Sequence, residues 1–206
     1  MSNISIKKLI LPVFSVLLGV LLAFSYQDAM RGDDVDPSPP NSPDWADKIP
    51  VKSLEEYLWN VDVILVGMVE KQEETFLQDS GIPTKRTFSF PVTPALIRVE
   101  NVVYGDVKSN VITLLQHGTT ENKKDLEKFV IPGKRYVLLL NETTTPGRYW
   151  ALNGPESIWE IENDIVKPKA PSYLDDLDKR NGSSLKVFLD DLKKSANNKK
   201  KPKFLG

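Results

Sequence analysis

The sequence predicts a mainly β protein in which five strands close into a small Greek-key barrel. Three apolar runs carry this prediction, at residues 61–69, 95–105 and 135–140. Runs rich in Val, Ile and Leu, bounded by Gly, Pro and Asn, are typical of β-strands. In the middle of the first run, Gly67 indicates a bend or a bulge, where a strand can turn from one part of a barrel to another.

The remaining strands follow from the same pattern along the chain. They are expected at residues 111–116, 149–152, 158–162 and 165–167. Asn163 and Asp164 separate the last two strands and tolerate the positive φ of a tight turn, so these strands should form an extra C-terminal hairpin. The polar segment 70–87 is expected to be a long loop between the first two strands.

Three helices are expected around these strands. Ser53 can cap a short helix that begins the domain, and Glu56 can complete its capping box. A second short helix is expected at about 123–129, between the third and fourth strands. After Ser183 or Ser184, apolar residues recur at helical spacing and indicate a C-terminal amphipathic helix; they are Leu185, Phe188, Leu189 and Leu192. This helix either docks on its own domain or binds a partner.

These patterns divide the chain into five parts. Residues 1–27 are expected to form a signal peptide or N-terminal membrane anchor, 28–52 a linker rich in Pro and Asp, 53–167 the β-barrel domain, 168–192 an irregular segment with the amphipathic helix, and 193–206 a disordered, Lys-rich tail. Proline disrupts helices and sheets, and the acidic residues keep the linker solvated and extended. The lysines of the tail can also contact an anionic lipid or a wall polymer.

The N-terminal segment predicts export from the cytoplasm. Lys7 and Lys8 precede an uncharged, largely apolar run over residues 9–27. A basic start followed by such a run is typical of signal peptides, and the run is also just long enough to span a bilayer. Ala23 and Ser25 permit cleavage after Ser25, which would release a secreted protein. Without cleavage, residues 9–27 anchor the chain in the cell membrane, with the N-terminus inside and the domain outside.

Composition excludes several classes of function. The chain has no cysteine, which excludes disulfides, thiolate zinc sites, cysteine nucleophiles and a lipoprotein anchor. The net charge of −1 conceals an acidic body, because residues 26–192 hold 19 basic and 28 acidic side chains, a net of −9. A nucleic-acid partner is not expected, since binding phosphates requires Lys and Arg on the binding face.

No catalytic or metal-binding set stands out in the sequence. His117 is the only histidine, and no zinc-ligand spacing or G-x-S-x-G nucleophile turn is present. The acidic pairs Asp175/Asp176 and Asp190/Asp191 are neighbours in sequence, so their side chains point apart on a helix. The prediction is therefore a protein that is not an enzyme and has no catalytic residue, metal or cofactor. A hydrolase that uses His117 is the remaining enzymatic alternative.

Aromatic residues are the best candidates for ligand binding. The predicted binding residues are Tyr149, Trp150 and Trp159, since an exposed ring can stack on a sugar or grip a peptide. Tyr149 and Trp150 are adjacent in one expected strand, so one of them faces the core and the other faces solvent. Packing in the core is the alternative explanation for each of these rings.

The element order is strand, strand, strand, short helix, strand, strand, and it resembles that of an OB-fold. Residues 62–69, 95–106 and 132–140 resemble the core pattern of netrin-like domains, which are typified by tissue inhibitors of metalloproteinases, and of uncharacterised exported proteins of Gram-positive bacteria. The resemblance covers residues 61–167 and implies a binding domain of the cell envelope whose partner is a protein or an envelope polymer. A netrin-like protease inhibitor is the alternative. The N-terminal cysteine of those inhibitors is missing here, so their inhibitory residues do not carry over.

Overall fold

The computed structural model describes residues 51–81 and 88–203 of the 206-residue chain. Residues 49–206 form one compact unit. The predicted signal or anchor segment, residues 1–27, lies outside the described residues. Within the described part of the chain, none of the helices has both the length and the apolar character needed to cross a membrane.

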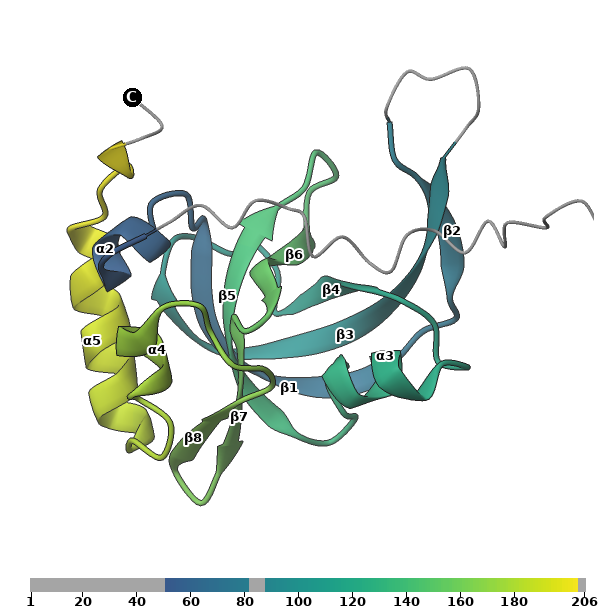
Figure 1. Ribbon diagram of the computed structural model, residues 1–206. Coiled ribbons are helices and arrows are strands. Elements are labelled where there is room, and N and C mark those ends of the chain that lie inside the picture. Colours follow the sequence, from purple (N-terminus) through teal and green to yellow (C-terminus); the bar gives the residue numbers. More distant parts are fainter. Residues whose placement is uncertain (1–50, 82–87, 204–206) are drawn as a thin grey trace, which may run out of the picture. The chain divides into compact units, whose positions relative to one another are not determined.

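Strands dominate the domain, as the sequence predicts, and a longer helix ends it (Figure 1). The elements in chain order are α2 (Leu54–Tyr57), β1 (Val63–Gln72), β2 (Phe76–Asp79), β3 (Ser89–Tyr104), β4 (Val111–His117), α3 (Lys123–Lys128), β5 (Arg135–Glu142), β6 (Arg148–Pro155), β7 (Ile158–Glu162), β8 (Ile165–Pro168), α4 (Asp175–Asp178) and α5 (Leu185–Asn197). The short helix expected at about 123–129 is α3, and the expected C-terminal hairpin is β7–β8.

All eight strands belong to one sheet that curls into a partly closed ring. The ring runs β1–β3–β4–β6–β5, and β1 also pairs with β5. The pairing of β4 with β6 is parallel, and the other pairings within the ring are antiparallel. Outside the ring, β2 pairs with β3, and the β7–β8 hairpin continues from β5. The predicted mainly β class is therefore confirmed.

Gly67 allows the two longest ring strands to approach each other closely. The β1–β3 register shifts between Val66 and Gly67, which confirms the expected irregularity in this strand. A Cβ atom built at Gly67 would lie 2.5 Å from Ile97 Cγ2 and 2.9 Å from the carbonyl oxygen of Arg98. Because real Cβ atoms do not come so close to a neighbouring backbone, only glycine fits without a shift of β3.

The apolar residues of β1 and β5 are buried on both faces, as the sequence predicts for the central strands. One set of side chains fills the inside of the ring, including Leu65, Leu138 and Leu140. The alternate set, including Ile64 and Leu139, packs outside the ring beneath the helices. This two-sided burial follows from the period of two in a strand, because consecutive apolar residues must then contact two separate cores.

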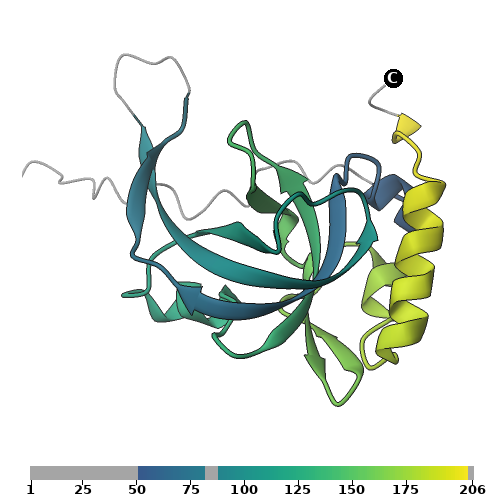
Figure 2. The same cartoon turned by 180° about the vertical axis from the view of Figure 1, so that it is seen from behind.

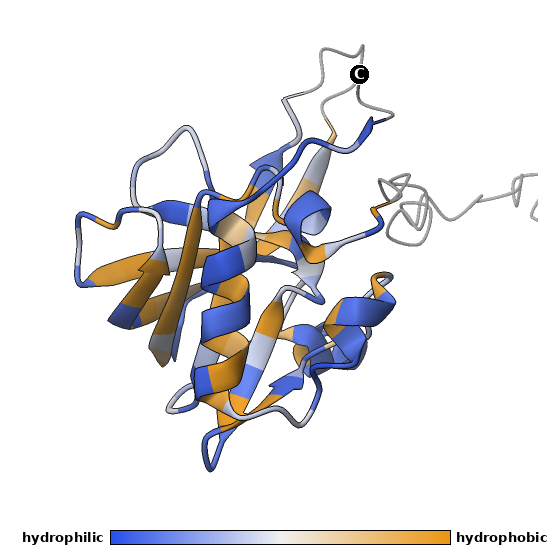
Figure 3. Ribbon diagram, turned by 90° about the vertical axis from the view of Figure 1, so that its left-hand side faces the viewer, coloured by the Kyte–Doolittle hydropathy of each residue, from blue (hydrophilic) through white to orange (hydrophobic). Residues whose placement is uncertain are grey.

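Helix α5 covers the outer core of its own domain. Phe188, Leu192 and Ala196 are buried, and the Phe188 ring lies 4.6 Å from that of Trp159. The Ser184 hydroxyl accepts a hydrogen bond from the Val187 amide and caps the helix. Figure 3 shows that the side of α5 turned away from the sheet is largely hydrophilic. The expectation that the amphipathic helix docks on its own domain is therefore confirmed.

Three local predictions are wrong. Segment 70–87 is not simply a loop, because β2 forms within it by pairing with the start of β3, which gives a polar segment regular backbone partners. The irregular stretch after Pro168 contains the one-turn helix α4. Residues 193–197, assigned to the disordered tail, continue α5, because Ser195 and Ala196 bury against the domain and extend the apolar stripe beyond Leu192.

Candidate recognition site

Strand β2 and the first residues of β3 form an arm that extends beyond the ring (Figures 1 and 2). Phe76 pairs with Val92, and Gln78 pairs with Phe90. Directly opposed residues of an antiparallel pair lie on the same face, so Phe76, Val92 and Phe90 share one face of the arm. The Ser80 amide donates to the carbonyl of Phe88 at 2.8 Å and continues the ladder toward the tip.

The arm exposes large apolar side chains to solvent. Phe76 is 37% exposed, Phe88 is 48% exposed, and Leu77, on the opposite face, is 73% exposed. Phe88 precedes Phe90 by two residues in extended chain, which places both on the face of Phe76. Contiguous exposed apolar groups are uncommon on monomeric proteins and often mark sites of interaction.

Three rings from separate strands pack in a row next to the arm. Val92 pairs with His117 across β3 and β4, and Leu115 pairs with Trp150 across β4 and β6. These registers place His117 and Trp150 on the same outer face as Phe90. The His117 ring lies 4.4 Å from Trp150 in a stacked arrangement and 4.9 Å from Phe90 in a tilted one. We define the aromatic face as Phe76, Phe88, Phe90, His117 and Trp150.

The two neighbouring rings change the chemistry of His117. Desolvation between them lowers the pKa of the imidazole below its ordinary value, which keeps it neutral at pH 7. A hydrolytic serine–histidine pair requires a hydrogen bond of about 2.6–3.2 Å. Among the described residues, no serine or carboxylate makes a hydrogen bond or ion pair with the His117 imidazole. This geometry lends no support to the hydrolase alternative.

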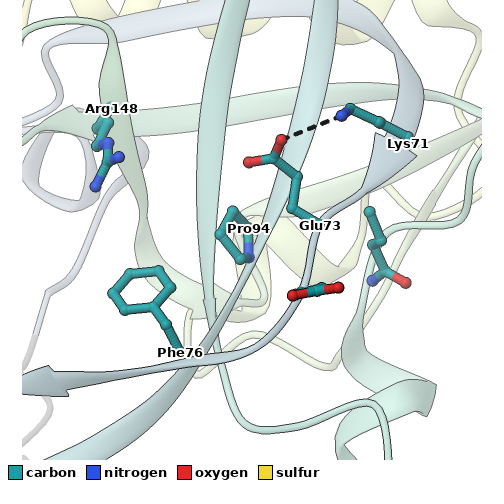
Figure 4. A pocket seen from close by; sticks show the side chains of 7 residues that line it. Lys71, Glu73, Phe76, Pro94 and Arg148 are labelled. Atoms are coloured by element: carbon teal, nitrogen blue, oxygen red, sulfur yellow. Dashed lines mark ion pairs between the residues drawn. The ribbon is translucent and has the colours of Figure 1, made fainter.

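A shallow pocket of about 480 Å³ adjoins the aromatic face at Phe76 (Figure 4). Its walls come from the end of β1, the connection to β2, the first residue of β2, one residue of β3 and the first residue of β6. The lining residues are Lys71, Gln72, Glu73, Glu74, Phe76, Pro94 and Arg148. The Lys71 Nζ atom lies 3.3 Å from a carboxylate oxygen of Glu73. Figure 4 places Arg148 on the other side of Pro94 from this ion pair.

Beside the exposed carboxylate of Glu74, Arg148 is the cation in this pocket that a ligand can most readily engage. Its side chain is exposed, and within residues 51–81 and 88–203 no carboxylate forms an ion pair with it. A guanidinium group presents a planar set of donors that matches a carboxylate or a phosphate. The site therefore combines exposed apolar rings with one cation that is available to an acidic group.

The three predicted binding residues lie in different environments in the structure. Trp150 lies on the aromatic face and is half-buried. Tyr149 is 3% exposed and points into the ring, as expected for one of two adjacent strand residues. Trp159 is fully buried under α5, where its Nε1 donates to the Glu156 carbonyl at 3.2 Å. Tyr149 and Trp159 therefore present no exposed ring, because each fills part of a core.

Sequence reasoning missed most of the aromatic face. Phe88 and Phe90 have the alternating spacing of a half-exposed strand, and Phe76 stands in an otherwise polar segment. These local patterns do not show that the three phenylalanines lie on the same face of the protein. Nor does any local pattern link His117 with Trp150, because their contact depends on the parallel pairing of β4 with β6.

A second polar cluster has a structural role beneath α2. The buried hydroxyls of Tyr57 and Ser157 are 2.7 Å apart, and the Tyr173 amide donates to Glu156 at 3.3 Å. Burial raises the pKa of Tyr57 and raises that of Tyr173 to about 12, so both phenols stay protonated. In the described part of the chain, no group of three or more His, Asp or Glu is arranged to hold a metal ion.

Two comparisons with known proteins were negative. No protein-family model matches the chain, and no curated protein matches it. Function must therefore be inferred from the aromatic face and the adjoining pocket. These features define the site by its chemistry, which is apolar and aromatic with one available guanidinium.

Proposed function

We propose that this protein is a non-catalytic recognition module of the cell envelope, which binds a protein partner through the aromatic face. The observation that carries the proposal is the row of contacting rings from Phe90 through His117 to Trp150, built from three strands, together with the exposed rings of Phe76 and Phe88. The apolar run over residues 9–27 supports an exported location, either anchored in the membrane or secreted after cleavage near Ser25.

The proposal includes an OB-like barrel as the fold of the ring. If β2 is treated as part of the first connection, the barrel strands in chain order are β1, β3, β4, β5 and β6, with α3 between the third and fourth. The pairing order first, second, third, fifth, fourth supports a five-stranded Greek-key barrel. OB-folds bind ligands on the face of strands two and three and on the loops that join strands one and two and strands four and five. Phe90 and His117 belong to the corresponding strands here.

A protein partner is favoured over a polysaccharide by the chemistry of the arm. Beside the polar Asp79 and Ser89, its exposed side chains include Phe76, Phe88 and Leu77, which match apolar side chains better than hydroxyl-rich sugars. Among the described strands, β2 pairs only with β3, so its other edge can accept an extended segment of a partner by strand addition. Arg148 then provides a site for an acidic residue of that segment.

Site-specific photocrosslinking in intact cells tests this assignment. A photoreactive phenylalanine analogue replaces Phe76 in one variant and Val187 in a control, because Val187 is an equally apolar residue, 55% exposed on α5. We expect a discrete protein adduct from position 76 and none from position 187. Adducts from position 187 alone, or adducts at position 76 only with polysaccharide, would contradict the proposal.

Affinity measurements with the captured partner then test individual rings. The substitutions Phe76→Ala and Trp150→Ala are expected to weaken binding by at least about thirtyfold each, the effect of losing an interface hot spot. Leu126→Ala provides the control, because Leu126 is 42% exposed on α3 and lies outside the aromatic face. Equal losses from all three substitutions would show that the rings contribute nothing specific.

The netrin-like inhibitor alternative and the predicted export have their own tests. Residues 49–206 can be assayed against metalloproteases, and inhibition at micromolar concentration would favour the inhibitor over the proposed module. N-terminal sequencing of the mature protein distinguishes a retained anchor from cleavage after Ser25. A mature protein recovered in the cytoplasm would contradict an envelope function altogether.

A further inference from the structure

The C-terminal end of α5 and the residues after it form a strongly basic surface. From Lys193 to Gly206 the chain has six lysines and no acidic residue, whereas residues 26–192 carry a net charge of −9. All six side chains are exposed; they are Lys193, Lys194, Lys199, Lys200, Lys201 and Lys203, which we define as the lysine surface. This segment therefore carries a net charge of about +6 next to a body with an acidic excess.

Specific contacts hold this surface against the domain. The Lys200 amide donates to the Glu55 carbonyl at 3.0 Å. The Nζ atom of Lys199 donates to the Val61 carbonyl at 2.9 Å and lies 5.2 Å from the centre of the Tyr104 ring. Pro202 is buried. Because the backbone is already ordered, binding to the exposed lysines loses less conformational entropy than binding to a disordered tail would.

The lysine surface lies beside the point where the chain enters the domain. Helix α2 begins soon after Val51 and contacts the end of α5, where the Ser195 hydroxyl donates to a carboxylate oxygen of Glu55 at 3.3 Å. Glu55 and Glu56 are the acidic residues of α2. The six lysines outnumber them, so the net charge of α2 and the lysine surface together is positive. Figures 1 and 2 both place α5 and the β2 arm on opposite sides of the domain.

We propose that the lysine surface binds the phosphate groups of an anionic lipid bilayer. Clustered lysine ammonium groups bind phosphate as point charges and attract a surface that presents many phosphates together. The bilayer is the favoured source of these groups because the described chain begins at this same end, downstream in sequence of the anchor proposed for residues 9–27. This contact does not depend on the aromatic face, which lies on the other side and remains available to a partner.

Vesicle binding by residues 49–206 tests the proposal, because this compact unit lacks the apolar segment that would itself enter lipid. We expect binding to phosphatidylcholine vesicles that contain about one third phosphatidylglycerol, and little binding to phosphatidylcholine alone. The substitutions Lys200→Gln, Lys201→Gln and Lys203→Gln together should weaken binding about a hundredfold. The control replaces Lys123, Lys124 and Lys128 of α3, which removes equal charge from another part of the domain and should have an effect of no more than about threefold.

Each possible result supports or overturns the lipid assignment. Loss of binding as the salt concentration rises from about 0.1 M to about 1 M supports an electrostatic surface. Equal weakening by the two triple variants overturns the proposal, since net charge alone would then explain binding. Soluble polyphosphate provides the second arm of the test. Tighter binding to polyphosphate than to vesicles, at equal accessible phosphate, would assign the site to a soluble phosphate polymer.

Discussion

At the scale of single residues, His117 shows how packing against neighbouring rings sets the properties of a side chain at the surface. The imidazole ends β4 at the surface, yet two rings remove water from its faces and lower its pKa. In this arrangement His117 adds a polar edge to an otherwise apolar row. Among the described residues, its ring contacts are Phe90 and Trp150.

The depressed pKa of His117 leads to a pH dependence of stability. The unfolded chain protonates this residue near pH 6.5, whereas the folded chain does so at lower pH. The unfolded state therefore binds more protons between these values, and the free energy of unfolding decreases as pH falls below about 6.5. Since His117 is the only histidine, no other imidazole contributes in this range.

The substitution His117→Phe keeps a ring between Phe90 and Trp150 but removes the titrating group. We expect its free energy of unfolding to fall less than that of the wild type when pH is lowered from about 7.5 to about 5.5. Chemical denaturation at several pH values measures this, and the acidic residues shared by both proteins cancel in the comparison. Parallel pH profiles would show that the folded state does not depress this pKa.

At the scale of elements, α5 depends on a few buried side chains. Phe188 and Leu192 are fully buried against Trp159 and the outer face of the sheet, while Val187 on the same helix is 55% exposed. The helix is thus part of the domain's core. Its polar outer side ends in the lysine surface, so one element serves both stability and, as we propose, contact with a bilayer.

Neighbouring residues of α5 should differ sharply in their effect on stability. Phe188→Ala is expected to lower the free energy of unfolding by about 3–5 kcal/mol, because it leaves a cavity beside Trp159. Val187→Ala changes a side chain exposed to water and should alter it by no more than about 0.5 kcal/mol. Denaturation with urea, followed by tryptophan fluorescence, reports both values. Similar losses for the two variants would indicate that α5 does not dock as described.

At the scale of the whole molecule, β1 and β5 have the longest runs of buried residues among the ring strands. β1 pairs with both β3 and β5, and β5 pairs with β1, β6 and β7. Their central residues are buried on both faces. The arm has the opposite character, because β2 pairs on one side only and exposes most of its side chains.

Hydrogen exchange should reveal this gradient directly. We expect amides of β1 and β5 to exchange only through global unfolding, with the free energy of unfolding of the whole domain. Amides of β2 should exchange through local opening, at a much smaller free energy that is almost insensitive to added urea. Mass spectrometry of peptides from each strand measures the difference. Equal protection of β2 and β1 would show that the arm is an integral part of the ring.

The sequence alone determined the elements whose physical causes are local. Alternating apolar residues predict the ring strands, Gly67 predicts an irregularity in β1, and Ser184 with the stripe around Phe188 predicts a capped amphipathic helix. These features depend on the spacing of residues within one segment. The strand β2 was missed because its residues carry little strand pattern and gain their conformation from β3.

Only the tertiary structure decided which aromatic residues face solvent. Trp150 and Trp159 look alike in sequence, yet α5 covers Trp159 while Trp150 meets His117 on an open face. Whether a ring is exposed depends on which distant segment packs over it, and neighbouring residues in the chain do not specify this. The same reason explains why the row from Phe90 through His117 to Trp150 emerged only once the strands were paired.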